Sequence, residues 1–405
     1  MSDSEKNIKP EFLEGSDTPE ADNTVGNEPA QAPDSNNTSG QAQFITSSGH
    51  HHRHHHHSSK SRKKRKRKKA VKRALIITGI VLLAVAVAVV STIAVLYNTG
   101  KNEMTSDNFD IKMPEKVEEV ESADNGRFIY YNKEKYRFKE DMINMLFLGV
   151  DENNGYETDG IGGNGQSDLL ALVAIDSGNS TVNIINIPRD IMTDVKVYSP
   201  SGGYSGTEKM QIAVAYAFGD GEDTSCINSI SAVRTLFYNI PINSYFALRM
   251  EGVPDVNDSI GGVDVKSPET ISIFEKGETY HLEGEEALMF VRTRSMYEAS
   301  ANLKRNQRQK AYLSSFINKF VSLTKNNVGV PMSVYNASAP YSYTNLNPNR
   351  IAYLATEFIV NKNMKIKMQS VPVTVKQNEN HAENYVKEEE FYKIFLNTFY
   401  EKVSK

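Results

Sequence analysis

The chain contains very little cysteine and, outside its N-terminal region, very little histidine. Cys226 is the only cysteine among 405 residues, so no intramolecular disulfide can form, and we expect a small buried apolar side chain. After residue 57 only His281 and His381 occur, both in polar surroundings. A zinc centre would lack ligands and a serine–histidine hydrolase would lack its nucleophile motif, so the sequence argues against both.

Long apolar runs are also missing, with one exception. Residues 74–97 contain no charge and are rich in Leu, Ile, Val and Ala, which is long enough for a helix across a hydrocarbon core of about 30 Å. Residues 61–73 before it carry ten Lys or Arg and no acid, whereas acidic residues follow it. The positive-inside rule predicts a single-pass cell-membrane protein with a cytoplasmic N-terminus and an extracellular domain beyond about residue 98. A cleaved signal peptide would be shorter and nearer the start.

The charge balance differs between the two sides of this segment. The net charge of −4 becomes −14 once the ten cations of residues 61–73 are set aside. So acidic a remainder is a poor partner for nucleic acid, and we expect the basic segment to contact anionic membrane lipid. A large extracytoplasmic domain without disulfides is typical of the surface of a bacterium.

Residues 1–60 are polar and nearly free of large apolar side chains, which predicts a disordered cytoplasmic tail. The histidine-rich tract at 50–57 is interpreted as low-complexity sequence, with metal binding and an internal purification tag as alternatives.

The rest of the chain shows the alternation of an α/β protein. Apolar runs predict buried strands at residues 143–150, 169–175, 182–187 and 245–250. Helical spacing predicts helices at residues 210–218, 225–238 and 284–291, and one from about residue 303 onward. This alternation favours a layered α/β domain. We expect an extracytoplasmic stalk and domain entry at 98–140, the catalytic domain at 141–325 and a C-terminal continuation of the extracellular part at 326–405.

Acidic and guanidinium side chains form the candidate site. Asp151 and Asp168 stand at the ends of apolar runs, and the downstream arginines are Arg189, Arg292, Arg294, Arg305 and Arg308. Carboxylates suit Mg²⁺, which fills its octahedron with waters and substrate phosphates, and guanidinium forks match phosphate oxygens. The combination predicts a pyrophosphate held with a divalent metal.

The spacing of these residues supports one shared site. On a helix Arg305, Arg308 and Gln309 project from one face. In an extended segment Arg292 and Arg294 would point the same way.

A literal G-x-G-x-x-G at Gly160, Gly162 and Gly165 does not predict a dinucleotide site. That fingerprint needs a strand before it and a helix after it, yet a polar loop precedes and the strand-like run at 169–175 follows. A flexible loop that allows the backbone to approach a phosphate is the favoured interpretation.

Seven motifs resemble, in order and spacing, those of the LytR-CpsA-Psr family. They are NMLFLGVD (Asn144–Asp151), QSDLLALVAID (Gln166–Asp176), NIPRD (Asn186–Asp190), KMQIAVAYAFG (Lys209–Gly219), IGGVDV (Ile260–Val265), LEGEEALMFVRTR (Leu282–Arg294) and KRNQRQ (Lys304–Gln309). The resemblance spans residues 140–325.

The resemblance implies a layered α-β-α domain with a central mixed sheet and a phosphotransferase activity. Members pass the sugar phosphate of a polyprenyl-pyrophosphate-linked glycopolymer, such as teichoic acid or capsule, to peptidoglycan and release polyprenyl phosphate. The lipid tail is expected in an apolar pocket between sheet and helices. A Gram-positive-type bacterium is implied as the source.

The resemblance also implies roles for individual residues within these motifs. Asp151 and Asp168 match the acids associated with Mg²⁺, for which Mn²⁺ is a possible substitute. Arg189, Arg292, Arg294, Arg305 and Gln309 match positions that hold the pyrophosphate. Lys209 and Arg308 match positions expected to support substrate binding, and Gln166 is expected to contact the substrate as well. These are expectations from the resemblance.

Two positions depart from the family pattern. Gln166 stands where the family usually has Arg, and Asn302 stands where an Asp is proposed to activate the acceptor hydroxyl. An amide cannot take up a proton at neutral pH, so Glu298 or Asp190 would have to do so. Two alternatives therefore stay open: a non-catalytic polyprenyl-phosphate-binding or regulatory protein, and a pyrophosphatase acting on the lipid carrier.

Overall fold

The computed structural model describes residues 59–105, 110–114, 116–139, 141–151, 165–295, 301–361, 363–377 and 382–403. The histidine-rich tract, Gly160, Gly162, Glu298 and His381 lie outside the described residues, as does the side chain of Asn302. By its internal contacts the chain divides into two units, Met1–Val71 and Lys72–Lys405. All elements discussed below lie in the second unit, except for the first turns of the N-terminal helix.

The apolar segment forms part of a single long helix, α1 (Ser59–Met104). The stretch from Lys63 to Met104 is long enough to cross a membrane, and its apolar part contains an 18-residue window with a mean hydropathy of 2.8. Its large apolar side chains between Val71 and Val95 are exposed. The helix continues past the predicted end at residue 97, and Met104 is buried in the folded domain.

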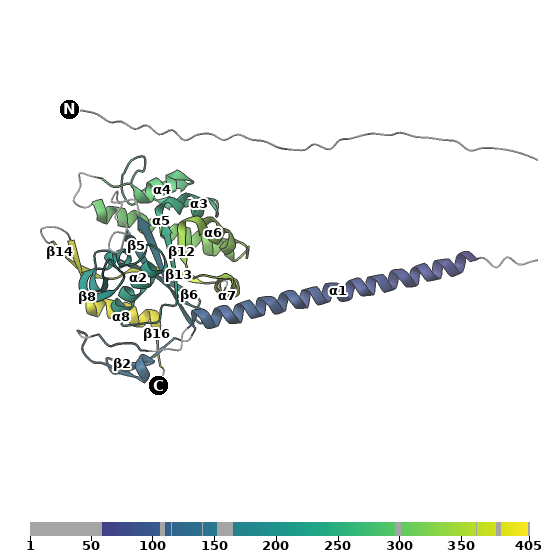
Figure 1. The fold of residues 1–405 in the computed structure, drawn as a ribbon, viewed down its shortest axis with the longest axis horizontal. Helices are drawn as coiled ribbons and strands as arrows, with labels where there is room; N and C mark the ends of the chain where they lie inside the picture. Colours follow the sequence, from purple (N-terminus) through teal and green to yellow (C-terminus); the bar gives the residue numbers. More distant parts are fainter. Residues whose placement is uncertain are drawn as a thin grey trace, which may run out of the picture. The chain divides into compact units, whose positions relative to one another are not determined.

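The domain is built on a six-stranded mixed sheet in the order β12-β9-β4-β5-β6-β13 (Figure 1). The strands are β4 (Met142–Asp151), β5 (Gln166–Asp176), β6 (Thr181–Ile187), β9 (Ser244–Arg249), β12 (Ser342–Thr344) and β13 (Lys365–Ser370). β5 pairs antiparallel with β4 and β6, whereas β9 joins β4 and β13 joins β6 in parallel. The four strands predicted from apolar runs are all present and lie side by side.

Both faces of the sheet are covered, which is why its central strands are apolar throughout. Leu146 and Leu148 of β4 pack with one set of helices, α2 (Asp223–Leu236) and α8 (Glu388–Phe399). Phe147, on the opposite face, packs with the other set. That set comprises α3 (Val253–Asp258), α4 (Glu285–Arg292), α5 (Ala301–Thr324), α6 (Val330–Ser338) and α7 (Pro348–Val360). The predicted α-β-α fold is confirmed.

Smaller elements complete the domain. Three hairpins are β7 (Met192–Tyr198) with β8 (Tyr204–Gln211), β10 (Val263–Lys266) with β11 (Thr279–Leu282), and β14 (Val373–Gln377) with β15 (Ala382–Val386). Short 3₁₀ turns are η1 (Asp124–Gly126), η2 (Ile212–Phe218), η3 (Met250–Gly252) and η4 (Ala339–Tyr341). The predicted helix at 210–218 is therefore a strand end followed by a 3₁₀ turn, because Met210 and Gln211 pair with β7.

Two predicted segments contribute strands to the folded domain. Within the predicted stalk and domain entry, β1 (Val120–Ala123), β2 (Phe128–Tyr131) and β3 (Glu134–Phe138) make a sheet with β16 (Tyr400–Lys402). Ile129 and Phe138 there are buried in the core. The predicted continuation beyond residue 325 adds β12 and β13 to the central sheet. Short, partly polar edge strands gave too weak an apolar signal to be recognised.

Candidate functional site

Asp151 and Asp168 meet at one end of the central sheet. Asp151 ends β4 and is paired with Gln166, the first residue of β5. The register shifts at Gly149/Val150, where Gly149 pairs with Leu169 and Val150 with Ser167. Asp168 is therefore the extra residue of a β-bulge, a feature that redirects a side chain and is common beside functional sites. The two aspartates are diagonal neighbours on adjacent strands.

Asp168 lies between two arginines that come from distant parts of the chain. Its two carboxylate oxygens are bound separately, one by Arg189 after β6 and the other by Arg305 Nη2 of α5 at 3.0 Å. Asp168 is 7% exposed and Arg305 is 6% exposed. Arg305 Nε is buried with no hydrogen-bond partner among the described residues. A buried charged donor without a partner is costly, so this nitrogen is suited to a ligand oxygen.

Arg292 and Arg294 border the same aspartates. Arg292 is the last residue of α4, and its Nη2 lies 3.9 Å from Asp151 Oδ1. Arg294 follows outside the helix and is exposed. The expectation that both belong to one extended segment is wrong, because α4 continues through Arg292. The chain still brings both guanidiniums to the site, since the positive charge of Arg294 acts on Arg189 and Arg305.

The cluster is rich in positive charge. Burial lowers the pKa of Arg189 and Arg305 below the ordinary guanidinium value, and the charge of Arg294 lowers both further. Four arginines (Arg189, Arg292, Arg294, Arg305) face three carboxylates (Asp151, Asp168, Asp190), which leaves one positive charge in excess. Partly buried, like-charged guanidiniums are stabilised by an anion, and a phosphate oxygen fits their geometry.

Polar neighbours fix the position of Arg189. Its Nη2 donates to Gln166 Oε1 at 2.5 Å, and its Nε lies 3.6 Å from Asp190 Oδ1. Gln211 Nε2 donates to the same oxygen of Asp190 at 3.3 Å. The side-chain carbonyl of Gln166 thus accepts a hydrogen bond from Arg189. An arginine at position 166 would instead repel the guanidinium of Arg189. Sequence reasoning missed Gln211, whose only signal was its place two residues after Lys209.

Arg308 and Gln309 point into the protein. Arg308 is 1% exposed; it pairs with Glu269 and donates to the backbone oxygens of Phe290, at 2.8 Å, and Thr293. Its guanidinium thus holds the end of α4 to α5, which differs from the substrate contact expected from the resemblance. Gln309 Nε2 donates to Val291 O at 3.3 Å, and its buried Oε1 has no hydrogen-bond partner among the described residues.

Lys209 lies apart from these contacts. It is an exposed residue of the β7–β8 hairpin, opposite Asp194. No ion pair joins its ammonium group to another residue of the described ranges. Its expected supporting role stays a prediction.

An apolar cavity of about 230 Å³ begins beside the cluster. Gly149 and Leu169, next to the bulge, and Gln309 line it at this end. Its other walls come from the sheet and from α3, α5, α6 and α7, and the lining side chains are almost all aliphatic or aromatic. A polar, cationic cluster next to a partly open apolar cavity suits a ligand with an anionic head and a long hydrocarbon tail.

Asp151 and Asp168 are the carboxylates expected to bind a metal at this place. No group of three or more His, Cys, Asp or Glu among the described residues could enclose an ion. Mg²⁺ is usually held by one or two carboxylates together with substrate phosphates. The donor set of Asp151 and Asp168 therefore fits Mg²⁺ when a phosphate ligand supplies further oxygens.

The fold and the site define an α-β-α domain with an anion-binding cluster above an apolar cavity, and comparison with known proteins gives its family. The sequence profile of the LytR_cpsA_psr family matches residues 94–398, so the chain belongs to this family. The match extends beyond the limits predicted from the motifs and includes β12, β13 and α8.

Curated relatives are named as teichoic acid transferases. The chain is 34% identical over 193 residues to the polyisoprenyl-teichoic acid–peptidoglycan teichoic acid transferase TagU of Bacillus anthracis, covering 46% of this chain and 56% of that protein. It is 31% identical over 194 residues to TagV of Bacillus subtilis, covering 45% of each. The chain thus spans about half the length of the curated relatives it matches.

The chain was also compared with solved structures. Protein gbs0355 from Streptococcus agalactiae superposes with a TM-score of 0.50 at 18% identity, covering 64% of this chain and 86% of that chain. B. subtilis TagV gives a TM-score of 0.47 at 24% identity, covering 64% and 95%.

Proposed function

We propose that the protein transfers a glycopolymer from a polyprenyl-pyrophosphate carrier to peptidoglycan in the presence of Mg²⁺ and releases polyprenyl phosphate. The observation that carries the proposal is the adjacency of the Asp168–Arg189–Arg305 cluster to the apolar cavity. Relatives that carry the names of teichoic acid transferases support the same reaction class.

The residues of the cluster would act mainly by binding and charge neutralisation. The acceptor hydroxyl oxygen would form a bond to the phosphorus attached to the sugar, while the bond from that phosphorus to the polyprenyl phosphate oxygen breaks. Negative charge then gathers on the leaving phosphate and the non-bridging oxygens. Arg305, with its unpartnered Nε, and Arg294 would bind these oxygens. The leaving phosphate needs little protonation.

The hydroxyl proton needs an acceptor. Asp190 is the carboxylate of the cluster whose side chain is most exposed, at 26%, and Gln211 and Arg189 orient it. We propose that it takes this proton, since the amide at position 302 cannot.

Asp151 and Asp168 would hold the metal together with the donor's phosphates. When bound, Mg²⁺ would neutralise charge on the pyrophosphate oxygens. Both carboxylates already contact arginines, so we expect strong Mg²⁺ binding only after the donor has entered.

The test is transfer by the full chain in phospholipid vesicles that contain a polyprenyl-pyrophosphate oligosaccharide, with soluble peptidoglycan and Mg²⁺. We expect labelled oligosaccharide phosphate on peptidoglycan, and at least about a hundredfold loss with Asp151→Asn or after chelation of the metal. Asp194→Asn, which removes an exposed carboxylate from β7, is the matched control.

Each alternative gives a different product. Free sugar phosphate without an acceptor would identify a pyrophosphatase. Donor binding without any transfer would identify a lipid-binding protein, and both results would overturn the proposed reaction.

A further inference from the structure

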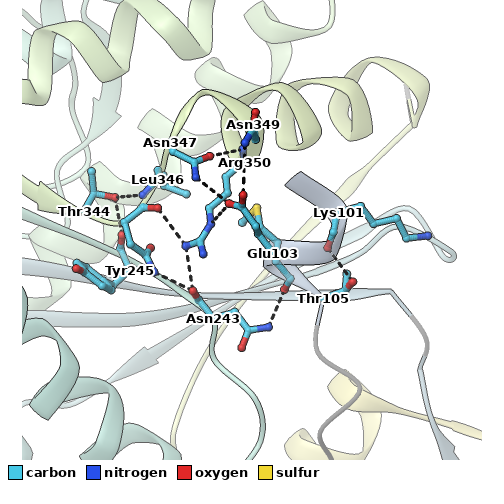
Figure 2. Close-up of polar contacts among 12 residues, drawn as sticks. Lys101, Glu103, Thr105, Asn243, Tyr245, Thr344, Leu346, Asn347, Asn349 and Arg350 are labelled. Carbon is cyan, nitrogen blue, oxygen red and sulfur yellow. Dashed lines mark hydrogen bonds and ion pairs between the residues drawn. The ribbon is translucent and has the colours of Figure 1, made fainter. Parts of the chain in front are cut away.

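The last turns of α1 are docked on the domain by a polar network centred on Glu103 (Figure 2). Glu103 Oε2 accepts hydrogen bonds from Asn347 Nδ2 at 2.8 Å and from Arg350 Nε at 2.9 Å. Asn243 Nδ2 donates to the carbonyl oxygen of Met104 at 3.1 Å and so satisfies one acceptor at the end of the helix. The end of the apolar helix is thus attached to the first turn of α7 and to the start of β9.

Further contacts show that α1 and α7 run antiparallel. Glu103 meets Arg350 in the first turn of α7. Six residues earlier on α1, Tyr97 donates from its hydroxyl to Glu357 Oε1 at 2.8 Å, and its ring meets that of Tyr353 edge to face at 5.1 Å. Moving backward along α1, toward the apolar segment, therefore means moving forward along α7.

The two helices touch backbone to backbone at Gly100. A Cβ atom at this position would lie 2.8 Å from Tyr353 Cβ and closer still to the carbonyl oxygen of Asn349. Only glycine permits this approach. Gly79, in the apolar part of the same helix, has no atom within 4 Å of the corresponding position.

The opposite face of α7 lines the apolar cavity. Ile351, Leu354 and Phe358 all contribute to the lining, and they extend over most of the length of α7. Phe358, near the C-terminal end of α7, contacts Phe320 of α5 edge to face at 6.2 Å. α7 therefore lies between α1 and the cavity and contacts both.

One end of the cavity lies beside the arginine cluster, and the other end is lined by apolar side chains. On α5 it is lined from Gln309, one turn after Arg305, to Val321. The twelve helical steps from Gln309 to Val321 correspond to a length of about 18 Å. The Phe320–Phe358 contact shows that the end remote from the arginines lies at the C-terminal end of α7. That is the end that the antiparallel contacts direct toward the apolar segment of α1.

We propose that the docking of α1 on α7 orients the domain on the membrane, with the C-terminal end of α7 and the apolar end of the cavity against the bilayer and the arginine cluster directed away from it. A hydrocarbon tail can then pass from the bilayer into the cavity along α7. Gly100, Glu103 and Arg350 are positioning residues in this arrangement. The part that concerns the donor rests on the proposed function, whereas the orientation does not.

An exposed apolar residue at the C-terminal end of α7 agrees with this orientation. Val360, the last residue of α7, is 70% exposed and lies about 4.5 Å beyond Glu357 in the direction of the apolar segment. Tyr97, at the end of that segment, is a residue type common at membrane interfaces. The charged cluster stays in water, on the side where a cell-wall acceptor would be met.

Membrane depth provides a test that needs no activity. A nitroxide label would be attached to Val360→Cys in the full chain, reconstituted in phosphatidylcholine vesicles. Cys226 is buried and burial raises the pKa of its thiol, so only the introduced cysteine should react. We expect contact with lipid-soluble oxygen at position 360, and water-like accessibility at Val375→Cys on β14, which Figure 1 shows on the side of the domain away from α1.

A matched pair of glycine substitutions tests the docking itself. Gly100→Leu should separate α1 from α7 and move the label at position 360 into water, whereas Gly79→Leu should leave its depth unchanged. With a long-chain donor in the bilayer, Gly100→Leu should reduce transfer by about tenfold or more. With a water-soluble short-chain donor, transfer should stay within about twofold of the parent protein.

The outcomes separate the orientation from the proposed reaction. Water-like accessibility at position 360 in the parent protein, or an unchanged depth in Gly100→Leu, would overturn the orientation. An equal loss of transfer with both donors would show that Gly100→Leu disturbs the folding of the domain, and this would overturn the positioning role of Gly100. If the parent protein transfers neither donor but position 360 is in lipid, the proposed function fails and the orientation stands.

Discussion

At the scale of single residues, Asp168 is held by two arginines from distant parts of the chain. Its two carboxylate oxygens are divided between Arg189 and Arg305, and its strand carries an extra residue at this place. The motifs identified these side chains from the sequence, because residue types are preserved in short segments. They could not show that Gln166 accepts from Arg189, since that contact depends on how β5 and the loop after β6 are brought together.

Arg294 offers a substitution with little cost to the fold, because its side chain is exposed. We expect Arg294→Ala to weaken binding of a polyprenyl pyrophosphate by about 10- to 150-fold, which corresponds to one charge-assisted contact of roughly 1.5–3 kcal/mol. The measurement is calorimetric titration in Mg²⁺. Lys310→Ala, which removes one positive charge from α5, is the control. Equal affinity in both variants would show that Arg294 does not contact the donor.

At the scale of elements, the contacts that hold α4 against α5 decide where the arginines point. α4 ends at Arg292, and Arg308 binds the carbonyl oxygens of Phe290 and Thr293 and the carboxylate of Glu269. Helical periodicity predicted both helices. It did not reveal Glu269, which lies 39 residues before Arg308 and outside every motif. This partner could be found only from tertiary contacts.

Removing the Arg308–Glu269 contact should lower the stability of the domain more than it weakens ligand binding. We expect Arg308→Met to lower the free energy of unfolding by roughly 3–5 kcal/mol, because a buried carboxylate loses its partner. The double variant Arg308→Met with Glu269→Gln should recover part of that loss. Denaturation in urea measures both. Full stability with lost donor affinity would instead support the substrate contact expected from the resemblance.

At the scale of the whole molecule, the end of the apolar helix α1 is joined to the domain by specific contacts. The sequence suggested a stalk because residues 98–140 are polar on average. The structure shows that a few of them, among them Met104 and Ile129, are fully buried and that Glu103 is bound by three side chains of the 347–350 segment. Average composition cannot show such contacts.

The docking of α1 should weaken in acid. The hydrogen bond from Asn347, with those from Arg350 and Asn349 and against the effect of burial, holds the pKa of Glu103 below its ordinary value of 4.5. Because the pKa of Glu103 is lowered in the docked state, the ionised Glu103 stabilises the docking of α1 fully above pH 4.5. This stabilisation is lost as the pH falls through the lowered pKa. The label at position 360 should therefore move toward water in acid, and this step should be absent in Glu103→Gln.

The sequence alone determined the apolar helix, the strands β4, β5, β6 and β9, the helices α2, α4 and α5, and the acidic and guanidinium residues of the site. These features depend on local periodicity and on residue type. Only the tertiary structure decided that Arg308 binds Glu269, that residues beyond 325 complete the central sheet, and that α1 is docked on α7. Each of these depends on contacts between residues far apart in the chain, and a local pattern carries no information about such contacts.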